Sequence, residues 1–430
     1  MSYYKAYPEY KDSDVQWIGK IPKHWKIIPI KRFTKLNTTR TSVTSDNITY
    51  IGLEDVESGS GRYLPTEGNS RQSEDSTVGV FGTGQVLYSK LRPYLRKAII
   101  ADFDGICSTE FLVLQPKDVF PELLKSWLLT PDVSQQIEST CEGAKMPRAD
   151  WDSIGNIPMP IAPASEQVII RDKFLLETAR IDLLIKKKSC FIELLKEKRN
   201  ALITNSTTKG LNSNEKMQDS CVEWLGHVPA HWAVKPFFTL ITEMNRKNTD
   251  LIESNVLSLS YGNIIQKPEN RNMGLTPDSY ETYQIVEPGE IVFRFTDLQN
   301  DKRSLRSAIV KQRGIITSAY MAVKPHSIEP NYLAWLMRSY DICKVFYAMG
   351  GGLRQSLKFE DVKRLPIIIP PIEEQIEISI FIERQLSLID TLVEKTQRSI
   401  HLLKERRMAF NTALITGKID VRSNQESIRE

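Results

Sequence analysis

The chain carries one distinctive motif twice. Residues 15–25 read VQWIGKIPKHW and residues 222–232 read VEWLGHVPAHW, so the second copy begins 207 positions after the first (222 − 15). Two tryptophans and one histidine at fixed spacing rarely match by chance. The period is far longer than the roughly 20–50 residues of a solenoid repeat. The repeat therefore predicts a duplicated domain.

The correspondence returns later in each half. At an offset of 208 the matched segments are Trp127 and Trp335, Glu166–Gln167 and Glu374–Gln375, and LLKEKR (194–199) and LLKERR (402–407). The two copies diverge between these points, from about residue 35 and from about residue 242. We therefore expect two copies of one unit that share a scaffold. The middle segments, which differ between the copies, are expected to face different surroundings.

Composition restricts the class of protein. The chain has 430 residues, of which 41% are hydrophobic and 26% are charged, which is ordinary for a soluble globular protein. Its five cysteines form no CxxC pair, so neither a disulfide framework nor a zinc ribbon is expected. The first residues, MSYYKAYPEYKDSD, do not resemble a signal peptide, and no apolar run approaches the roughly 18 residues of a membrane span. We expect a cytoplasmic protein, and the net charge of +4 permits nucleic acid without requiring it.

Each half reads as a mixed α/β domain. The short runs at 84–91, 97–103 and 110–116 are rich in β-branched residues and are bounded by Gly, Asp or Pro, which is typical of strands. Residues 121–140 then show helical spacing after a proline suited to a first turn, and the second half repeats this order. We expect Trp127 and Trp335, and the four tryptophans of the opening motifs, to be structural.

A long helix follows each α/β domain. The expected boundaries are a first domain at 1–163, a long helix and linker at 164–211, a second domain at 212–371, a second long helix at 372–422 and a tail at 423–430. Apolar positions in the second helix alternate in steps of four and three: Ile382, Leu386, Ile389, Val393, Thr396, Ile400 and Leu403. The matching positions of the first helix are Phe174, Thr178, Ile181, Ile185, Lys188, Ile192 and Leu195. This heptad seam predicts that the two helices pair, and the duplication favours an antiparallel coiled coil with a pseudo-twofold axis.

Basic residues cluster in one loop of each half. In residues 89–97 they are Lys90, Arg92, Arg96 and Lys97, with Tyr94 among them; in residues 294–306 they are Arg294, Lys302, Arg303 and Arg306, together with Gln299 and Asn300. Cations attract phosphates, and Arg, Gln and Asn suit the edges of bases. A solvated loop is the alternative, but the same placement in both copies favours DNA binding.

A second candidate loop follows the helix of each domain. It reads CEGAKMPRAD at 141–150 and GGGLRQSLKFED at 350–361. Glycines allow close approach of the backbone, and Lys145, Arg148, Arg354 and Gln355 could reach a groove of DNA. A simple helix C-cap is an equally good interpretation.

Signals for catalysis are weak. His24 and His231 match each other but have no carboxylate or cysteine at ligand spacing, so we expect structural histidines and no metal site. The segment GVFGTGQV at 79–86 has glycines at P-loop spacing, but Gln85 stands where a lysine is required. Neither an NPPF nor a DPPY methyltransferase motif is present.

These features together resemble the specificity subunit of type I restriction-modification enzymes. The segments that carry the resemblance are KDSDVQWIGKIPKHW and QDSCVEWLGHVPAHW, PMPIAPASEQ and PIIIPPIEEQ, and LLKEKRNALI and LLKERRMAF. The resemblance implies two α/β target-recognition domains, each reading one part of a split site in double-stranded DNA, and helices that bind two modification subunits. It also implies that the chain is not itself an enzyme and needs no cofactor. Modification subunits would use S-adenosylmethionine to methylate adenine, and restriction subunits would use ATP and Mg²⁺ for translocation and cleavage.

Other function classes remain open from the residues alone. A related modification-only or fused type II system would use a similar recognition subunit. A nuclease site within a recognition domain would need clustered carboxylates, and none is convincing. A coiled-coil adaptor that binds only protein would not need the basic loops.

Overall fold

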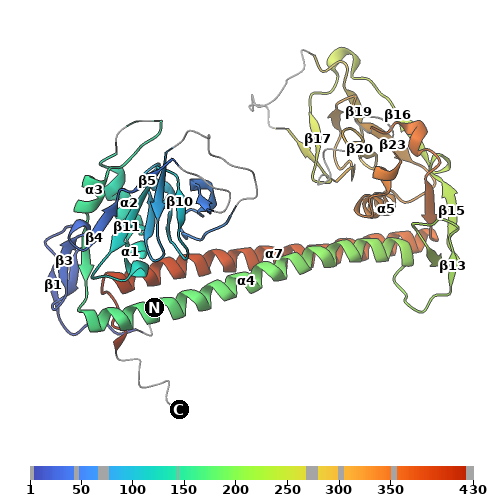
Figure 1. The fold of residues 1–430 in the computed structure, drawn as a ribbon. Coiled ribbons are helices and arrows are strands. Elements are labelled where there is room, and N and C mark those ends of the chain that lie inside the picture. Colours follow the sequence, from blue (N-terminus) through green and yellow to red (C-terminus); the bar gives the residue numbers. More distant parts are fainter. Residues whose placement is uncertain are drawn as a thin grey trace. The chain divides into compact units, whose positions relative to one another are not determined.

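The structure is a computed structural model that describes residues 4–42, 48–65, 77–141, 143, 145–267, 279–298, 305–349 and 356–422. Its contacts divide the chain into two compact units, Met1–Lys188 with Arg398–Glu430, and Ser189–Gln397. Each unit therefore contains one globular part and a portion of each long helix. The chain is of the α/β class, as the sequence predicts (Figure 1).

The first unit is built on two four-stranded sheets. The antiparallel sheet has the order β4-β11-β8-β9, with bounds Thr34–Asn37, Phe111–Pro116, Val86–Ser89 and Ala98–Ile100. The other has the order β5-β7-β10-β6, with bounds Arg40–Thr41, Val78–Phe81, Gly105–Cys107 and Tyr50–Ile51. Two-stranded sheets pair β1 (Tyr10–Asp12) with β2 (Lys20–Pro22), and β3 (Lys26–Pro29) with β12 (Pro158–Ile161). The opening motif is thus tied by β3 and β12 to the segment that precedes the long helix.

Three short helices complete this unit: α1 (Pro121–Leu128), α2 (Pro131–Glu138) and α3 (Trp151–Asn156). The prediction of a single helix over 121–140 is wrong, because the chain breaks between α1 and α2. Pro131 cannot continue a helix, and the residue before a proline is driven out of the helical region. Thr130 is accordingly extended, with a ψ of 146°.

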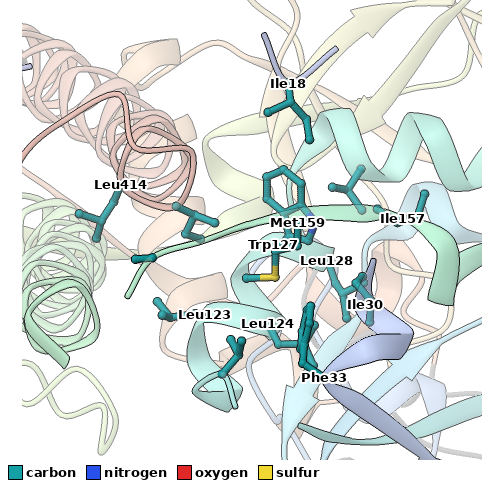
Figure 2. Packing of buried hydrophobic residues seen from close by; sticks show 14 of the residues in the cluster. Ile18, Ile30, Phe33, Leu123, Leu124, Trp127, Leu128, Ile157, Met159 and Leu414 are labelled. Carbon is teal, nitrogen blue, oxygen red and sulfur yellow. The ribbon is translucent and has the colours of Figure 1, made fainter. Parts of the chain in front are cut away.

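The core of the first unit forms around α1. Trp127 is 1% exposed, and its ring stacks on that of Trp17 from the opening motif, with centroids 5.6 Å apart. Figure 2 shows Ile18, Met159 and Leu414 among the apolar side chains around Trp127. The repeated motif therefore contributes directly to the hydrophobic core, as expected for structural tryptophans.

The second unit repeats this plan. Its four-stranded antiparallel sheet has the order β16-β23-β20-β21, with bounds Ile241–Met244, Met321–Pro325, Ile291–Phe293 and Ser307–Ile309. Two-stranded sheets are β13 (Met217–Asp219) with β14 (His227–Pro229), β15 (Ala233–Pro236) with β24 (Pro366–Ile369), β17 (Leu257–Ser260) with β18 (Asn263–Gln266), and β19 (Gln284–Val286) with β22 (Gly314–Ile316). The helices are α5 (Pro330–Ile342) and α6 (Phe359–Val362). Single 3-10 turns occur at Ile30–Arg32, Leu53–Asp55, Pro93–Leu95, Phe237–Thr239, Thr249–Leu251 and Val345–Ala348.

The tryptophans of the second unit are less uniformly buried. Trp232 is 3% exposed, like its counterpart Trp25 at 1%. Trp335 is only partly buried against the core, and Trp224 is 41% exposed, with its ring edge-on to Tyr340 at 4.6 Å. The opening motif keeps its inner tryptophan in both units, whereas the outer one packs differently.

The long helices are α4 (Ala164–Lys209) and α7 (Ile372–Ile415), shown in green and red in Figure 1. Within the first unit the early part of α4 lies beside the late part of α7, since Thr178 and Asn411 are hydrogen-bonded at 3.5 Å. Within the second unit the late part of α4 lies beside the earlier part of α7, because Arg199 of α4 pairs with Asp390 of α7. The helices are thus antiparallel, as predicted. The predicted seam includes Ile181, Ile185, Ile192 and Leu195 of α4 and Ile382, Leu386, Ile389 and Thr396 of α7, all at most 9% exposed.

A glycine with positive φ follows each long helix: Gly210, directly after α4, at +75°, and Gly417, two residues after the end of α7, at +68°. Glycine takes this conformation without strain, which suits it to the residue after a helix. A Cβ on Gly210 would lie 3.3 Å from the indole of Trp232, and one on Gly417 would lie 3.2 Å from that of Trp25. The end of α4 thus packs on the opening motif of the second unit, and the end of α7 on that of the first. Among the residues described, no helix is long and apolar enough to cross a membrane.

Candidate nucleic-acid interface

The two candidate basic loops of the first unit lie side by side. The amide of Ala149 donates to the carbonyl of Lys90 at 3.0 Å, and the amide of Arg92 donates to the carbonyl of Pro147 at 2.8 Å. Leu91 and Arg148 form an isolated β-bridge between the loops. The sequence placed these loops about 50 residues apart, and only tertiary structure makes them one surface.

The second unit makes the corresponding contact. The amide of Leu357 donates to the carbonyl of Phe295 at 3.1 Å. Leu357 corresponds to Ala149, and Phe295 corresponds to Lys90, because the strand motifs GQVLYSK and GEIVFRF align from Gly84 and Gly289. The same pair of loops therefore meets in both copies.

The backbone of the first-unit loop is tightly bent. Arg92 and Arg96 have φ values of 51° and 48° on either side of the turn Pro93–Leu95. The hydroxyl of Ser134 in α2 donates to the carbonyl of Pro93 at 3.2 Å, which fixes this turn to the domain. Tyr94 at the centre of the turn is 50% exposed. The turn is therefore anchored to helix α2 and exposes the ring of Tyr94 to solvent.

The predicted cations of the first unit differ in how far they are available. Lys145 is exposed, and Lys90 and Arg92 are half-buried. Arg148 is exposed but pairs with Glu110 at 3.0 Å, so part of its charge is compensated. Arg96 is directed to the long helix, where its guanidinium donates to the sulfur of Met408 at 3.6 Å.

One predicted DNA contact, Arg306, is wrong. Arg306 is 0% exposed, and its guanidinium donates to the carbonyls of Thr296 at 3.0 Å and Asp297 at 3.3 Å. A fully buried arginine cannot reach a phosphate or a base. Lys97 occupies the corresponding position of the first unit and donates to the carbonyl of Leu53 at 2.7 Å. Arg306 therefore belongs to the frame of the loop, whereas Lys97 is half-buried, like Lys90 and Arg92.

Of the remaining predicted DNA contacts, the structure describes only Arg294. Arg294 is half-buried, and its amide donates to the carbonyl of Arg306 at 2.8 Å. Gln299, Asn300, Lys302, Arg303, Arg354 and Gln355 lie outside the described residues.

Each opening motif is fixed to a long helix by a glutamate of that helix. Glu166, near the start of α4, is 5% exposed and accepts from the indole of Trp25 at 3.2 Å and from the phenol of Tyr7 at 2.6 Å; His24 Nε2 lies 2.7 Å from its carboxylate. Burial, and then Glu166, raise the pKa of Tyr7 far above its ordinary value, so the phenol stays a donor. In the second unit Glu374 of α7 takes the same role.

The second-unit contacts of Glu374 match closely. The indole of Trp232 donates to it at 3.0 Å, and His231 Nε2 lies 2.9 Å from it. The carboxylate partner of each histidine is thus 142 or 143 residues away in the chain, where ligand spacing could not reveal it. One feature of the sequence indicates this contact: the His-Trp pair and the Glu-Gln pair both repeat, at offsets of 207 and 208 residues. In the part of the chain that the structure describes, no three His, Cys, Asp or Glu residues gather as a metal site.

A second repeated contact joins the helices to each other. Asp182 of α4 pairs with Arg407 of α7 in the first unit, and Asp390 of α7 pairs with Arg199 of α4 in the second. Both partners are related by the offset of 208 (182 + 208 = 390; 199 + 208 = 407). The same ion pair therefore occurs in both units: α4 supplies the aspartate in the first unit and the arginine in the second.

A cavity lies beside this ion pair in each unit. In the first unit it measures about 240 Å³ and is lined by Arg62, Lys125, Asp182 and Arg407, among others. Lys125 donates to the carbonyl of Gly61 at 2.8 Å, and burial, with a smaller effect of Arg407, lowers its pKa to about 8. In the second unit the cavity measures about 560 Å³ and is lined by Arg199, Trp335 and Arg338.

Known proteins with related sequences and folds agree on one class. Over 166 residues, 37% of each chain, the protein is 26% identical to the type I restriction enzyme EcoDI specificity subunit of Escherichia coli. Over 333 residues, 74% of this chain and 75% of the relative, it is 22% identical to the type I restriction enzyme MjaVIII specificity subunit of Methanocaldococcus jannaschii. The chain resembles type I restriction specificity subunits. No protein-family model matches it.

Two solved structures share the fold of this chain. The HsdS subunit of Thermoanaerobacter tengcongensis aligns with a TM-score of 0.51 at 16% identity, covering 93% of this chain and 98% of that one. A chain from a study of complex assembly and conformational transition of a type I R-M system aligns with a TM-score of 0.67 at 15% identity, covering 93% and 99%. The sequence match to the EcoDI specificity subunit spans only 37% of that relative's length, so its activity is not transferred directly.

Proposed function

We propose that this chain is the DNA-recognition subunit of a type I restriction-modification complex, and that each unit reads one half of a bipartite target. The observation that carries the proposal is the duplicated loop pair, in which Lys90 meets Ala149 and Phe295 meets Leu357 through equivalent backbone hydrogen bonds. In the first unit this surface bears Lys90, Arg92 and Lys145 beside the exposed ring of Tyr94. Cations and an exposed aromatic ring on a rigid frame are suited to phosphates and bases.

The long helices are proposed to bind two modification subunits in equivalent ways. Large apolar side chains remain exposed at matching positions, Leu184 and Leu392 at 41% and 44%, and Leu194 and Leu402 at 56% each. Exposed apolar residues that recur with the repeat support two copies of one partner. The restriction subunits would join through the same complex.

Catalysis is proposed to belong to the partner subunits. They would supply S-adenosylmethionine for adenine methylation and ATP with Mg²⁺ for translocation and cleavage, while this chain supplies only the choice of sequence.

Reconstitution tests the proposal. The purified chain alone is expected neither to methylate nor to cut DNA, and addition of the cognate modification subunit should produce methylation at a split sequence, mapped by methylation sequencing. Mass measurement of the complex should give two modification subunits per chain. Methylation by the chain alone, or by the modification subunit without it at the same sequence, would contradict the assignment.

A further inference from the structure

The basic loop of each unit is closed by the same backbone hydrogen bond. The amide of Ser89 donates to the carbonyl of Lys97 at 2.9 Å, and the amide of Arg294 donates to the carbonyl of Arg306 at 2.8 Å. The positions that close the loop lie 8 residues apart in the first unit (97 − 89) and 12 apart in the second (306 − 294). The second loop is therefore four residues longer than the first.

The longer loop has a buried arginine at its base. The guanidinium of Arg306 donates to the carbonyls of Thr296 and Asp297 at 3.0 and 3.3 Å, and its Nε lies 3.4 Å from the hydroxyl of Tyr347. The amide of Arg306 donates to a carboxylate oxygen of Asp341 at 2.6 Å. One residue thus joins the outgoing stem of the loop (residues 294–298), the returning stem (residues 305–307) and helix α5.

The first unit builds this place from apolar residues. Ser307 and Asp341 correspond to Ala98 and Val133, both 0% exposed. In the second unit the hydroxyl of Ser307 and one oxygen of Asp341 are buried without a hydrogen-bond partner among the described residues. Because buried polar groups are costly when unpaired, the scaffold alone does not account for this polar cluster. It accompanies only the longer loop.

We propose that Arg306 is a positioning residue that clamps the two stems of this loop, residues 294–298 and 305–307, and so fixes these stems relative to their domain. The inference rests on the proposed function, since it assumes that these stems contact DNA. Arg306 itself makes no contact with DNA in this view. It acts by joining Thr296 and Asp297 to the returning stem, so that the residues carried by the stems meet the DNA in one geometry.

The test is Arg306→Lys in the complex with the cognate modification subunit. Lysine keeps the charge, but a single ammonium lacks the planar fork that reaches two carbonyls at once. Binding to a duplex with both half-sites should weaken about tenfold, as expected for the loss of a hydrogen bond from a charged group. Binding to a duplex that keeps only the first half-site should not change. Amide hydrogen exchange should rise in residues 294–298 and 305–307.

Arg313→Lys is the matched control, because Arg313 lies in the same unit but outside this loop, where its guanidinium pairs with Glu253 at 3.2 Å. It should leave both exchange and the half-site pattern unchanged. If Arg306→Lys binds both duplexes like the wild type, or weakens binding with no change in exchange, Arg306 is not a clamp. If Arg306→Lys melts at a lower temperature, the second variant is Tyr347→Phe, which removes the hydroxyl that contacts the guanidinium of Arg306. Weaker binding of the second half-site at an unchanged melting temperature supports the clamp. Binding like that of the wild type overturns it.

Failure of the proposed function gives a different result. In that case the wild-type complex would bind no split DNA sequence at all, while exchange in the stems would still respond to Arg306→Lys. The two readouts therefore separate the clamp from the reading role.

Discussion

Lysine and arginine side chains in the basic loops have two distinct kinds of surroundings. Lys97 and Arg306 turn inward to backbone carbonyls, whereas Lys145 is exposed and Lys90 and Arg92 are half-buried at the surface. We predict that Arg92→Ala weakens DNA binding by the complex and lowers the slope of log K against log salt by about one. Salt titration of binding measures this slope.

Lys11 provides the control for that titration, because it is exposed on strand β1, outside the basic loops. Lys11→Ala should leave the slope unchanged. An Arg92→Ala slope equal to that of the wild type would return Arg92 to the role of a solvated loop residue.

Lys125 predicts a pH dependence of stability. Its pKa is about 8 in the folded chain, against an ordinary value of 10.5, because burial disfavours the charged form. Between these values the unfolded chain binds more protons, so the free energy of unfolding rises as pH increases from about 8 to about 10.5. Below about pH 8 the buried charge costs its full amount, on the order of 3 kcal/mol.

Lys125→Met removes this titration. The stability of the variant minus that of the wild type should therefore be largest near pH 7 and fall by up to about 3 kcal/mol toward pH 10.5. Urea unfolding across this range measures the difference, with Lys11→Met as an exposed control whose difference should stay flat. A flat difference for Lys125→Met as well would mean that the folded-state pKa of Lys125 is not lowered.

At the scale of elements, the paired helices hold each unit together. Ile181 of α4 and Ile389 of α7 occupy equivalent seam positions, at 4% and 5% exposure, in the first and second unit respectively. Truncation of a buried isoleucine to alanine costs about 2–5 kcal/mol. We predict a similar loss for Ile181→Ala and Ile389→Ala, but in different units.

Hydrogen exchange resolved by peptide distinguishes the two losses. Ile181→Ala should accelerate exchange mainly in residues 4–188 and 398–422, and Ile389→Ala mainly in residues 189–397. The exposed neighbours Leu183 and Leu388, at 52% and 54%, provide alanine controls with little expected effect. Identical exchange patterns for the two seam variants would contradict the division into units.

At the scale of the whole molecule, both long helices run without a break from one unit into the other, α4 past residue 188 and α7 past residue 397. If they set the distance between the two half-sites, one extra heptad in each, after Lys188 and after Gln397, should lengthen the DNA spacer. Seven residues add about 10.5 Å of helix, or about three base pairs at roughly 3.4 Å each. Methylation mapping of the variant complex reads the spacer directly.

A heptad is chosen because it keeps the apolar seam in register. Two residues inserted at the same points would rotate the following seam by about 200° and should destabilise the chain instead. An active heptad variant that methylates at the original spacer would mean that the modification subunits, and not these helices, measure the target.

The sequence alone determined the features that depend on local or repeated pattern. The duplication, the α/β class and the seam from Ile181 to Leu195 follow from spacing, because periodicity along the chain is kept when a strand or helix forms. Pro131 shows the limit, since a helical pattern on both sides of it concealed the break between α1 and α2.

Tertiary structure decided which side chains are available. A lysine or arginine turns toward whatever acceptors surround it, and those come from distant parts of the chain. Leu53 accepts from Lys97, 44 residues away, and Glu166 meets His24 across 142 residues. No local pattern records such partners. Burial therefore made Arg306 part of the frame, although the sequence groups it with the other cations of residues 294–306.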